Sequence, residues 1–105
     1  MASNYYSKNT HTASTSYTGE TIDSEHLRTV SIQVQWTGLD VKDGSWQLQV
    51  SNDGASWVDK SSKNCVAANG LSEYSEECHQ RFVRAYITNG ANTVGTYTIT
   101  IMCKV

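Results

Sequence analysis

Apolar and polar residues alternate along three stretches of the chain, at residues 30–36, 46–50 and 97–103. A repeat of two residues is the pattern of a strand that buries one face, because successive side chains point to opposite sides. A fourth stretch, residues 81–88, is rich in the β-branched and aromatic residues that strands favour. The pattern therefore predicts four strands, each with an apolar face turned to the core.

Turn-forming residues separate these stretches. Gly38 and the pair Asp43-Gly44 lie between residues 30–36 and 46–50, Asn-Asp-Gly follows at residues 52–54, and residues 89–95 precede the last stretch. Glycine and asparagine adopt the backbone conformations that tight turns require. The best helix candidate, residues 71–78, has too few apolar positions for more than one turn. We therefore expect an all-β fold, a single antiparallel β-sandwich of the jelly-roll kind.

The beginning of the chain has a different character. Residues 1–25 carry tyrosines in a background of serine, threonine and asparagine, so we divide the chain into an extended N-terminal arm (1–25) and a sandwich domain (26–105). A segment of this kind buries too little apolar surface to order itself, so it either adds a strand to its own sheet or lies on another chain. Tyrosine offers a large amphipathic contact area, which favours the second alternative.

The expected assembly interface consists of the large side chains of this arm, namely Tyr5, Tyr6, Tyr17 and Ile22. On this interpretation, deletion of residues 1–22 leaves a folded monomer that no longer assembles.

Composition narrows the possible functions. Serine, threonine, asparagine and glutamine account for 37 of 105 residues, the net charge is -2, and proline is absent. The chain is not basic, which argues against a nucleic-acid partner. It contains no stretch of about 18 apolar residues, so no transmembrane helix is expected. Residues 1–9 are polar, so we expect no signal peptide and synthesis in the cytoplasm.

The sequence offers little catalytic or metal-binding chemistry. Cys78 and His79 are adjacent, and adjacent side chains on a strand point apart. The three cysteines and three histidines lack the spacing of a zinc site, and the loop aspartates are more typical of turns than of a calcium site. We therefore expect no enzyme activity, no catalytic residues, no metal and no cofactor. An odd number of cysteines favours reduced thiols, with a bridge between Cys65 and Cys78 as the alternative.

Two motifs carry a resemblance to known proteins. The stretch LQVSNDG at residues 48–54 is followed by Trp57, and RFVR stands at residues 81–84. Across residues 30–103 this pattern resembles small β-sandwich structural proteins of tailed phages, of the capsid-decoration type. The resemblance implies a non-enzymatic virion protein, a decoration or cement protein that assembles through its N-terminal arm and its sheet surfaces. Its partners would be further copies of itself, in a homotrimer, and the major capsid protein or other virion proteins.

The same motifs are similar to those of discoidin-like, galactose-binding-like jelly rolls. The alternative function is therefore a carbohydrate- or receptor-binding module of a tail appendage or adhesin. Its ligand surface would combine the acidic loops with the tryptophan after the hairpin, namely Asp40, Asp43, Asp53 and Trp57. A tail or neck connector is a third alternative, which differs from the first in symmetry. Trp36 and Trp46 fall on the apolar phase of their strands and are expected in the core, with Trp57 capping one end.

Overall fold

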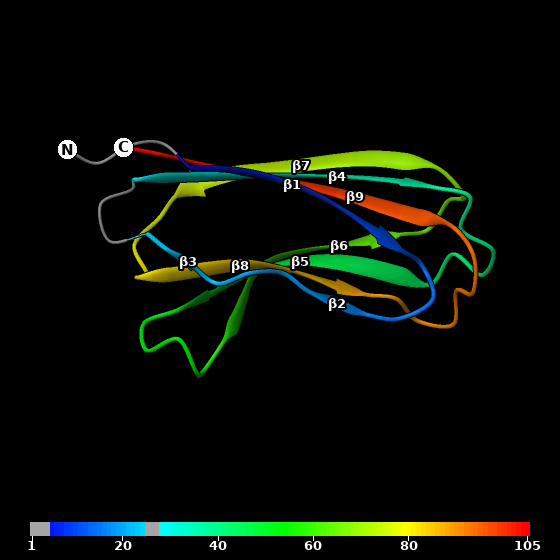
Figure 1. Cartoon of the computed structure of the whole chain (residues 1–105), viewed down its shortest axis with the longest axis horizontal. Coiled ribbons are helices and arrows are strands. Elements are labelled where there is room, and N and C mark those ends of the chain that lie inside the picture. The colour runs from blue at the N-terminus through cyan, green and yellow to red at the C-terminus, as the bar shows by residue number, and fades with distance from the viewer. Residues whose placement is uncertain (1–4, 25–27) are drawn as a thin grey trace.

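The computed structural model describes residues 5–24 and 28–105, and these residues form strands connected by turns and loops (Figure 1). The strands in chain order are β1 (Tyr5–Thr12), β2 (Tyr17–Thr18), β3 (Ile22–Asp23), β4 (Thr29–Thr37), β5 (Gly44–Ser51), β6 (Val58–Cys65), β7 (Gly70–Glu77), β8 (Phe82–Thr88) and β9 (Thr96–Lys104). The described part of the chain contains no helix that is long and apolar enough to span a membrane.

The strands form two antiparallel sheets that lie one over the other (Figure 1). The four-stranded sheet has the order β1-β9-β4-β7. The five-stranded sheet has the order β2-β8-β5-β6, and β3 pairs with β8 beside β2. The prediction of an all-β antiparallel sandwich is therefore confirmed.

The core lies between the sheets and is built mainly from alternate residues of β4, β5, β8 and β9, the four strands that the sequence predicted. Trp36 and Trp46 belong to it as expected, with 6% and 1% of their surfaces exposed. The largest side chains that are fully buried include Trp46, Tyr97, Ile32, Leu48, Ile87, Val30, Val34 and Val83. The opposite residues of these strands are mostly polar and face away from the core.

Within residues 26–105, the strands β6 and β7 have no counterpart in the sequence prediction. Nearly all side chains of β6 are exposed, so its sequence carries no alternation to detect. The helix candidate at residues 71–78 is wrong, because residues 70–77 form β7 and pair with β4 from Trp36–Gly70 to Thr29–Glu77. A Cβ atom on Gly70 would lie 2.3 Å from the ring of Trp36, so this pairing requires glycine there.

The described residues of the predicted arm belong to the sandwich. β1 pairs with β9 along its whole length, from Tyr5–Cys103 to Thr12–Thr96, while β2 and β3 pair with β8. Of the two alternatives for this segment, the structure therefore has the one in which it adds strands to its own sheets. The predicted boundary between residues 25 and 26 lies outside the described residues.

All three cysteines are free thiols, so the structure has no bridge between Cys65 and Cys78. Burial raises the pKa of Cys65 to about 11, and burial together with the nearby Cys78 raises the pKa of Cys103 to about 11. A thiol with so high a pKa is a poor nucleophile at neutral pH. Cys65 and Cys103 therefore act as small apolar core residues.

Candidate functional site

The four residues of the predicted ligand surface lie at opposite ends of the sandwich. Asp40 and Asp43 precede β5, whereas Asp53 and Trp57 follow it. β5 has eight residues, so at a rise of about 3.3 Å per residue its ends are separated by roughly 23 Å. In Figure 1 the loop after β5 hangs below the sheets at the left, and the loop before it lies at the right. The structure therefore does not assemble these four residues into one site.

At the first end, the aspartates hold a neighbouring loop, residues 89–95. Asp40 accepts hydrogen bonds from the backbone N–H of Thr93 at 2.9 Å and from its hydroxyl at 2.6 Å. Both carboxylate oxygens of Asp43 lie 3.0 Å from the backbone nitrogen of Ala91. These carboxylate oxygens hold the loop at residues 89–95 in place, which agrees with the expectation that the loop aspartates stabilise turns. Among the described residues there is no group of three or more potential metal ligands of the His, Cys, Asp or Glu type.

Asn92 is the centre of this loop cluster. Its side-chain oxygen accepts hydrogen bonds from the backbone N–H groups of Val41 and Lys42, each at 2.9 Å. Its side-chain nitrogen donates to the carbonyl of Asn89 at 2.8 Å. Asn92 is only 2% exposed, so it satisfies backbone groups that would otherwise be buried without partners. The sequence predicts a turn at residues 89–95 but gives no sign that Asn92 bridges two loops.

At the other end, Asp53 organises the loop at residues 52–57. Its Oδ1 atom accepts hydrogen bonds from the backbone N–H groups of Ala55 and Ser56, each at 2.8 Å. The hydroxyl of Ser51 donates to the same oxygen at 2.9 Å. This is the local geometry expected of an aspartate that starts a turn.

Hydrogen bonds to the charged form lower the pKa of both capping aspartates. For Asp53 the bonds from Ser56 and Ala55 lower the pKa to about 2, and for Asp40 the bonds from Thr93 do the same. Both carboxylates are exposed, so each contributes only modestly to the free energy of unfolding. Because the folded-state pKa lies below the ordinary 3.8, the stabilisation is present above pH 3.8 and is lost as pH falls towards 2.

We expect the free energy of unfolding to decline between pH 3.8 and about 2, and the double variant Asp40→Asn, Asp53→Asn to flatten this decline. Asparagine retains an acceptor oxygen for the backbone N–H groups but does not titrate in this range. Urea unfolding followed by tryptophan fluorescence at several pH values measures the effect. Parallel curves for the wild type and the double variant would contradict it.

Trp57 is half-buried and packs on a charged side chain instead of capping the core. The guanidinium carbon of Arg84 lies 4.1 Å from the centre of its ring, which is a cation–π contact. The Nε atom of Arg84 donates to Gln49 at 2.8 Å, and the amide of Gln49 donates to Asp59 at 2.9 Å. The polar groups around Trp57 are therefore engaged with one another.

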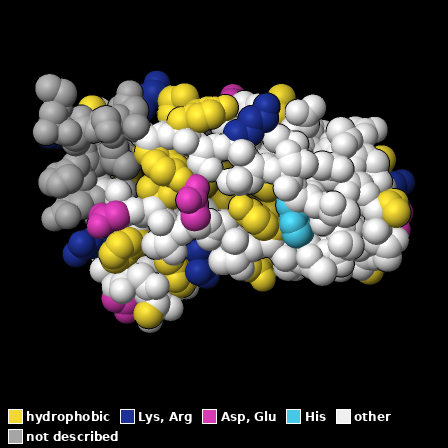
Figure 2. Space-filling model, viewed as in Figure 1, with side chains coloured by type: hydrophobic (Ala, Val, Ile, Leu, Met, Phe, Trp, Pro, Cys, Tyr) yellow, Lys and Arg dark blue, Asp and Glu magenta, His cyan; other side chains and the backbone are white. Residues whose placement is uncertain are grey.

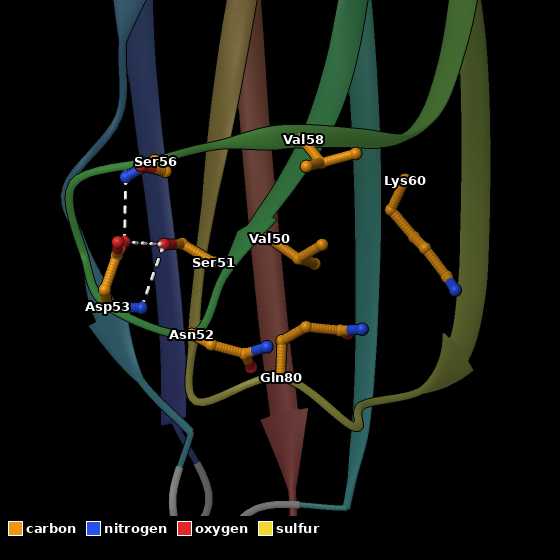
Figure 3. A pocket seen from close by; sticks show the side chains of 8 residues that line it. All are labelled: Val50, Ser51, Asn52, Asp53, Ser56, Val58, Lys60 and Gln80. Atoms are coloured by element: carbon orange, nitrogen blue, oxygen red, sulfur yellow. Dashed lines mark hydrogen bonds between the residues drawn. The ribbon is translucent and has the colours of Figure 1, made fainter.

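A cleft of about 460 Å³ lies beside this loop, and Figure 3 shows the side chains that line it. The lining residues are Val50, Ser51, Asn52, Asp53, Ser56, Val58, Lys60 and Gln80. Trp57 is not among them, and Ser51 and Asp53 are held in the turn. Lys60 forms an ion pair with Glu76 of the opposite sheet at 3.8 Å. The cleft thus offers a few amide and hydroxyl groups beside two valines.

The predicted assembly residues have different environments. Ile22 is 4% exposed and belongs to the core, so it is not available to a partner in this fold. The hydroxyl of Tyr5 donates to the carboxylate of Glu20, and the ring of Tyr17 lies 5.0 Å from that of His11. Tyr6 is 60% exposed. An interface role for the three tyrosines stays a prediction, and Tyr6 is the one whose ring is largely uncovered.

The outer face of the four-stranded sheet is the second surface considered for assembly, because the polar residues of the predicted strands point outwards there. Thr96, Thr98 and Thr100 of β9 alternate with core residues along its middle. Thr98 lies between Thr10 of β1 and Gln35 of β4 in the sheet register. Figure 2 shows a different view, the side of the sandwich where β1 and β3 lie in front, and there hydrophobic side chains and charged side chains of both signs are spread among uncharged ones. This face is polar and regular in its middle, and its charged residues lie on the edge strands and at the end of β9, namely Lys8, Glu73, Glu77 and Lys104.

Comparisons with known proteins concern the fold and the family. The sequence model of the family described as "Uncharacterised protein YqxG N-terminal domain" matches residues 2–104. No curated protein gives a significant sequence match.

Solved structures with a similar fold include the PBSX exported protein XepA, with a TM-score of 0.71 and 13% identity over 96% of this chain and 37% of XepA. The SPBc2 prophage-derived protein YomS has a TM-score of 0.57 at 10% identity, over 99% of this chain and 97% of YomS. A protein of Bacillus endospore appendages, described as disulfide-linked pili, has a TM-score of 0.56 at 13% identity, over 97% and 87%. These likenesses concern the fold, and the resemblance to phage β-sandwich proteins is confirmed at that level.

Proposed function

Since the chain belongs to the family of the "Uncharacterised protein YqxG N-terminal domain", we propose that it is a non-enzymatic structural protein of a phage-derived particle. The similarity of its fold to a prophage-derived protein of nearly the same length supports this proposal. The chain spans 37% of XepA, so a place as one domain of a larger particle protein fits as well.

The observation that carries the proposal is the outer face of the four-stranded sheet. Uncharged polar side chains such as Thr98 and Gln35 can be buried against a protein partner without the cost of desolvating a charge. They remain solvated when no partner is bound. Many copies on a symmetric particle make weak contacts of this kind cumulative. The face therefore suits a subunit that packs beside other subunits.

The specific role that we propose is decoration of the capsid surface, as a homotrimer in contact with the major capsid protein. The test is to purify particles from the organism that encodes the chain, after induction of the prophage, and to locate the chain by quantitative mass spectrometry and cryo-electron microscopy. We expect a copy number that matches the capsid lattice. A few copies per particle would indicate a tail or neck connector and overturn decoration, and absence from particles would overturn the structural role.

A variant tests the face itself. Thr98→Arg places a long cation in the middle of the outer face, and we expect it to reduce occupancy on particles at least tenfold, because the charge must be desolvated in the interface. Asn64→Arg on the exposed strand β6 is the matched control and should bind as the wild type does. Equal occupancy of both variants would exclude this face as the contact.

A further inference from the structure

The four-stranded sheet ends in two long strands with open edges. β1 and β7 each have eight residues, and among the described residues neither has a neighbour on its outer side. An open edge exposes a row of backbone N–H and C=O groups that can pair with another strand.

On β1, one hydrogen bond shows which residues point their backbone N–H and C=O groups outwards. The N–H of Ala13 donates to the carbonyl of Gly95 at 2.9 Å and continues the register of β1 with β9. Because backbone groups of antiparallel strands alternate in direction, the odd residues of β1 face β9 and Tyr6, Lys8 and Thr10 face outwards.

The same argument applies to β7. The N–H of Cys78 donates to the carbonyl of Arg28 at 2.7 Å and continues the register of β7 with β4. Leu71, Glu73 and Ser75 therefore turn their backbone groups to the open edge. With Thr12 of β1 and Glu77 of β7, each edge offers four outward residues.

The two edges are complementary in direction and in charge. Each strand of the sheet is antiparallel to the next, so β1 and β7 run in opposite directions, and β1 of a second copy continues the antiparallel order beyond β7. β7 carries Glu73, Glu76 and Glu77 and no cation, whereas the charged residue of β1 is Lys8. Opposite charges in facing positions stabilise a strand pair.

We propose that copies of this chain assemble head to tail, with β1 of one copy paired antiparallel to β7 of the next and Lys8 opposite Glu73. The contact joins two different surfaces, so it generates a closed ring or an open filament. A homotrimer is one such ring. The inference thereby names the partner and the contact for the structural role proposed above, and it rests on that role.

This register also accounts for exposed and unpartnered groups on the two edges. It places Tyr6 opposite Ser75 and Thr10 opposite Leu71, which covers side chains that are 60% exposed at Tyr6 and 62% exposed at Leu71. On the inner side, Asn9 comes to lie opposite Ser72. The Ser72 hydroxyl is buried without a hydrogen-bond partner, and a facing asparagine amide can supply one.

A symmetric pairing of β7 with β7 is the obvious rival for the second copy. Antiparallel pairing centred on Glu73 places the two Glu73 side chains opposite each other, and pairing centred on Ser75 places Glu73 of each copy opposite Glu77 of the other. Like charges in facing positions destabilise a strand pair. The charge pattern therefore favours the head-to-tail contact.

The test is sedimentation equilibrium of the full chain over a range of concentrations, with charge-reversal variants. We expect the wild type to associate and Lys8→Glu or Glu73→Lys alone to weaken association at least tenfold. The double variant, with both reversals, should restore it, because the opposite charges face each other again. Lys63→Glu on β6 makes the same charge change away from both edges and should associate as the wild type does. Thermal unfolding by circular dichroism checks that each variant is folded.

A wild type that is monomeric at all concentrations would overturn the inference. So would association that survives both single reversals, or a double variant that is no more associated than the single ones. Occupancy on particles is a separate measurement, so a monomer that still binds particles would refute the head-to-tail contact and leave the structural role intact. A chain that associates as expected but does not bind particles would refute the structural role and leave the head-to-tail contact intact.

Discussion

A chain that lacks residues 1–22 is expected to lose its cooperative fold. The deletion removes β1 and with it the partner of β9 along eight positions, from Tyr5–Cys103 to Thr12–Thr96. It also removes Ala13 and Ile22, which are 0% and 4% exposed in the core. Several kcal/mol of lost burial and strand pairing approach the whole stability of a domain of this size, about 5–15 kcal/mol. Circular dichroism during urea unfolding should show no sigmoidal transition.

Addition of the missing segment in trans is the control for this deletion. A synthetic peptide of residues 5–24 supplies β1, β2 and β3, and it should restore a transition when added in excess. The sequence alone favoured a folded monomer after this deletion, so the experiment separates an arm from an integral part of the sheets. A truncated chain that unfolds with the midpoint of the wild type would contradict the structure.

Replacement of Trp46 by alanine should destabilise the chain by about 3–5 kcal/mol, because it removes a large buried side chain and leaves a cavity. Trp46 is 1% exposed and lies in the middle of the core. Its indole N–H has no hydrogen-bond partner. Trp46→Phe should therefore cost much less, since it keeps an aromatic ring and removes a donor that is buried without a partner. Urea unfolding of both variants measures the difference.

Trp36 provides the matched comparison, because its indole N–H donates to the carbonyl of Ala67 at 3.1 Å. Trp36→Phe leaves that carbonyl without its donor. We therefore expect phenylalanine to preserve a smaller fraction of the tryptophan's contribution to the free energy of unfolding at position 36 than at position 46. The reverse order would show that the indole N–H of Trp46 makes a stabilising contact.

The sequence predicted the strands that bury one face and missed those that do not. Central strands such as β4 alternate between core and solvent, and this alternation is visible without any structure. β1 and β6 lie at sheet edges and have few fully buried side chains, so their sequences lack the signal. For β7, pairing with β4 decides the conformation, and pairing between distant segments cannot be read from local composition.

For the candidate site, the sequence predicted the chemistry of single residues better than their arrangement. Asp40 and Asp53 hold turns, as turn-forming aspartates were expected to do. Their separation was already implied by the predicted strand at residues 46–50, because loops before and after one strand lie at its opposite ends. The charge complementarity of β1 and β7 could not be predicted, since it depends on which strands form the edges of the sheet.

The pairing of β1 with β9 has a consequence for biosynthesis. Tyr5 lies opposite Cys103, so the first described strand has no partner until residues 96–104 have been synthesised and have left the ribosome. β4 pairs with β7 on one side and with this same strand on the other, so it acquires its second neighbour only then. Contacts between residues so far apart in sequence also close late and slowly, because a long loop must be ordered first. The four-stranded sheet is therefore completed only after translation of this whole region, and until then the nascent chain exposes the apolar faces that later form the core.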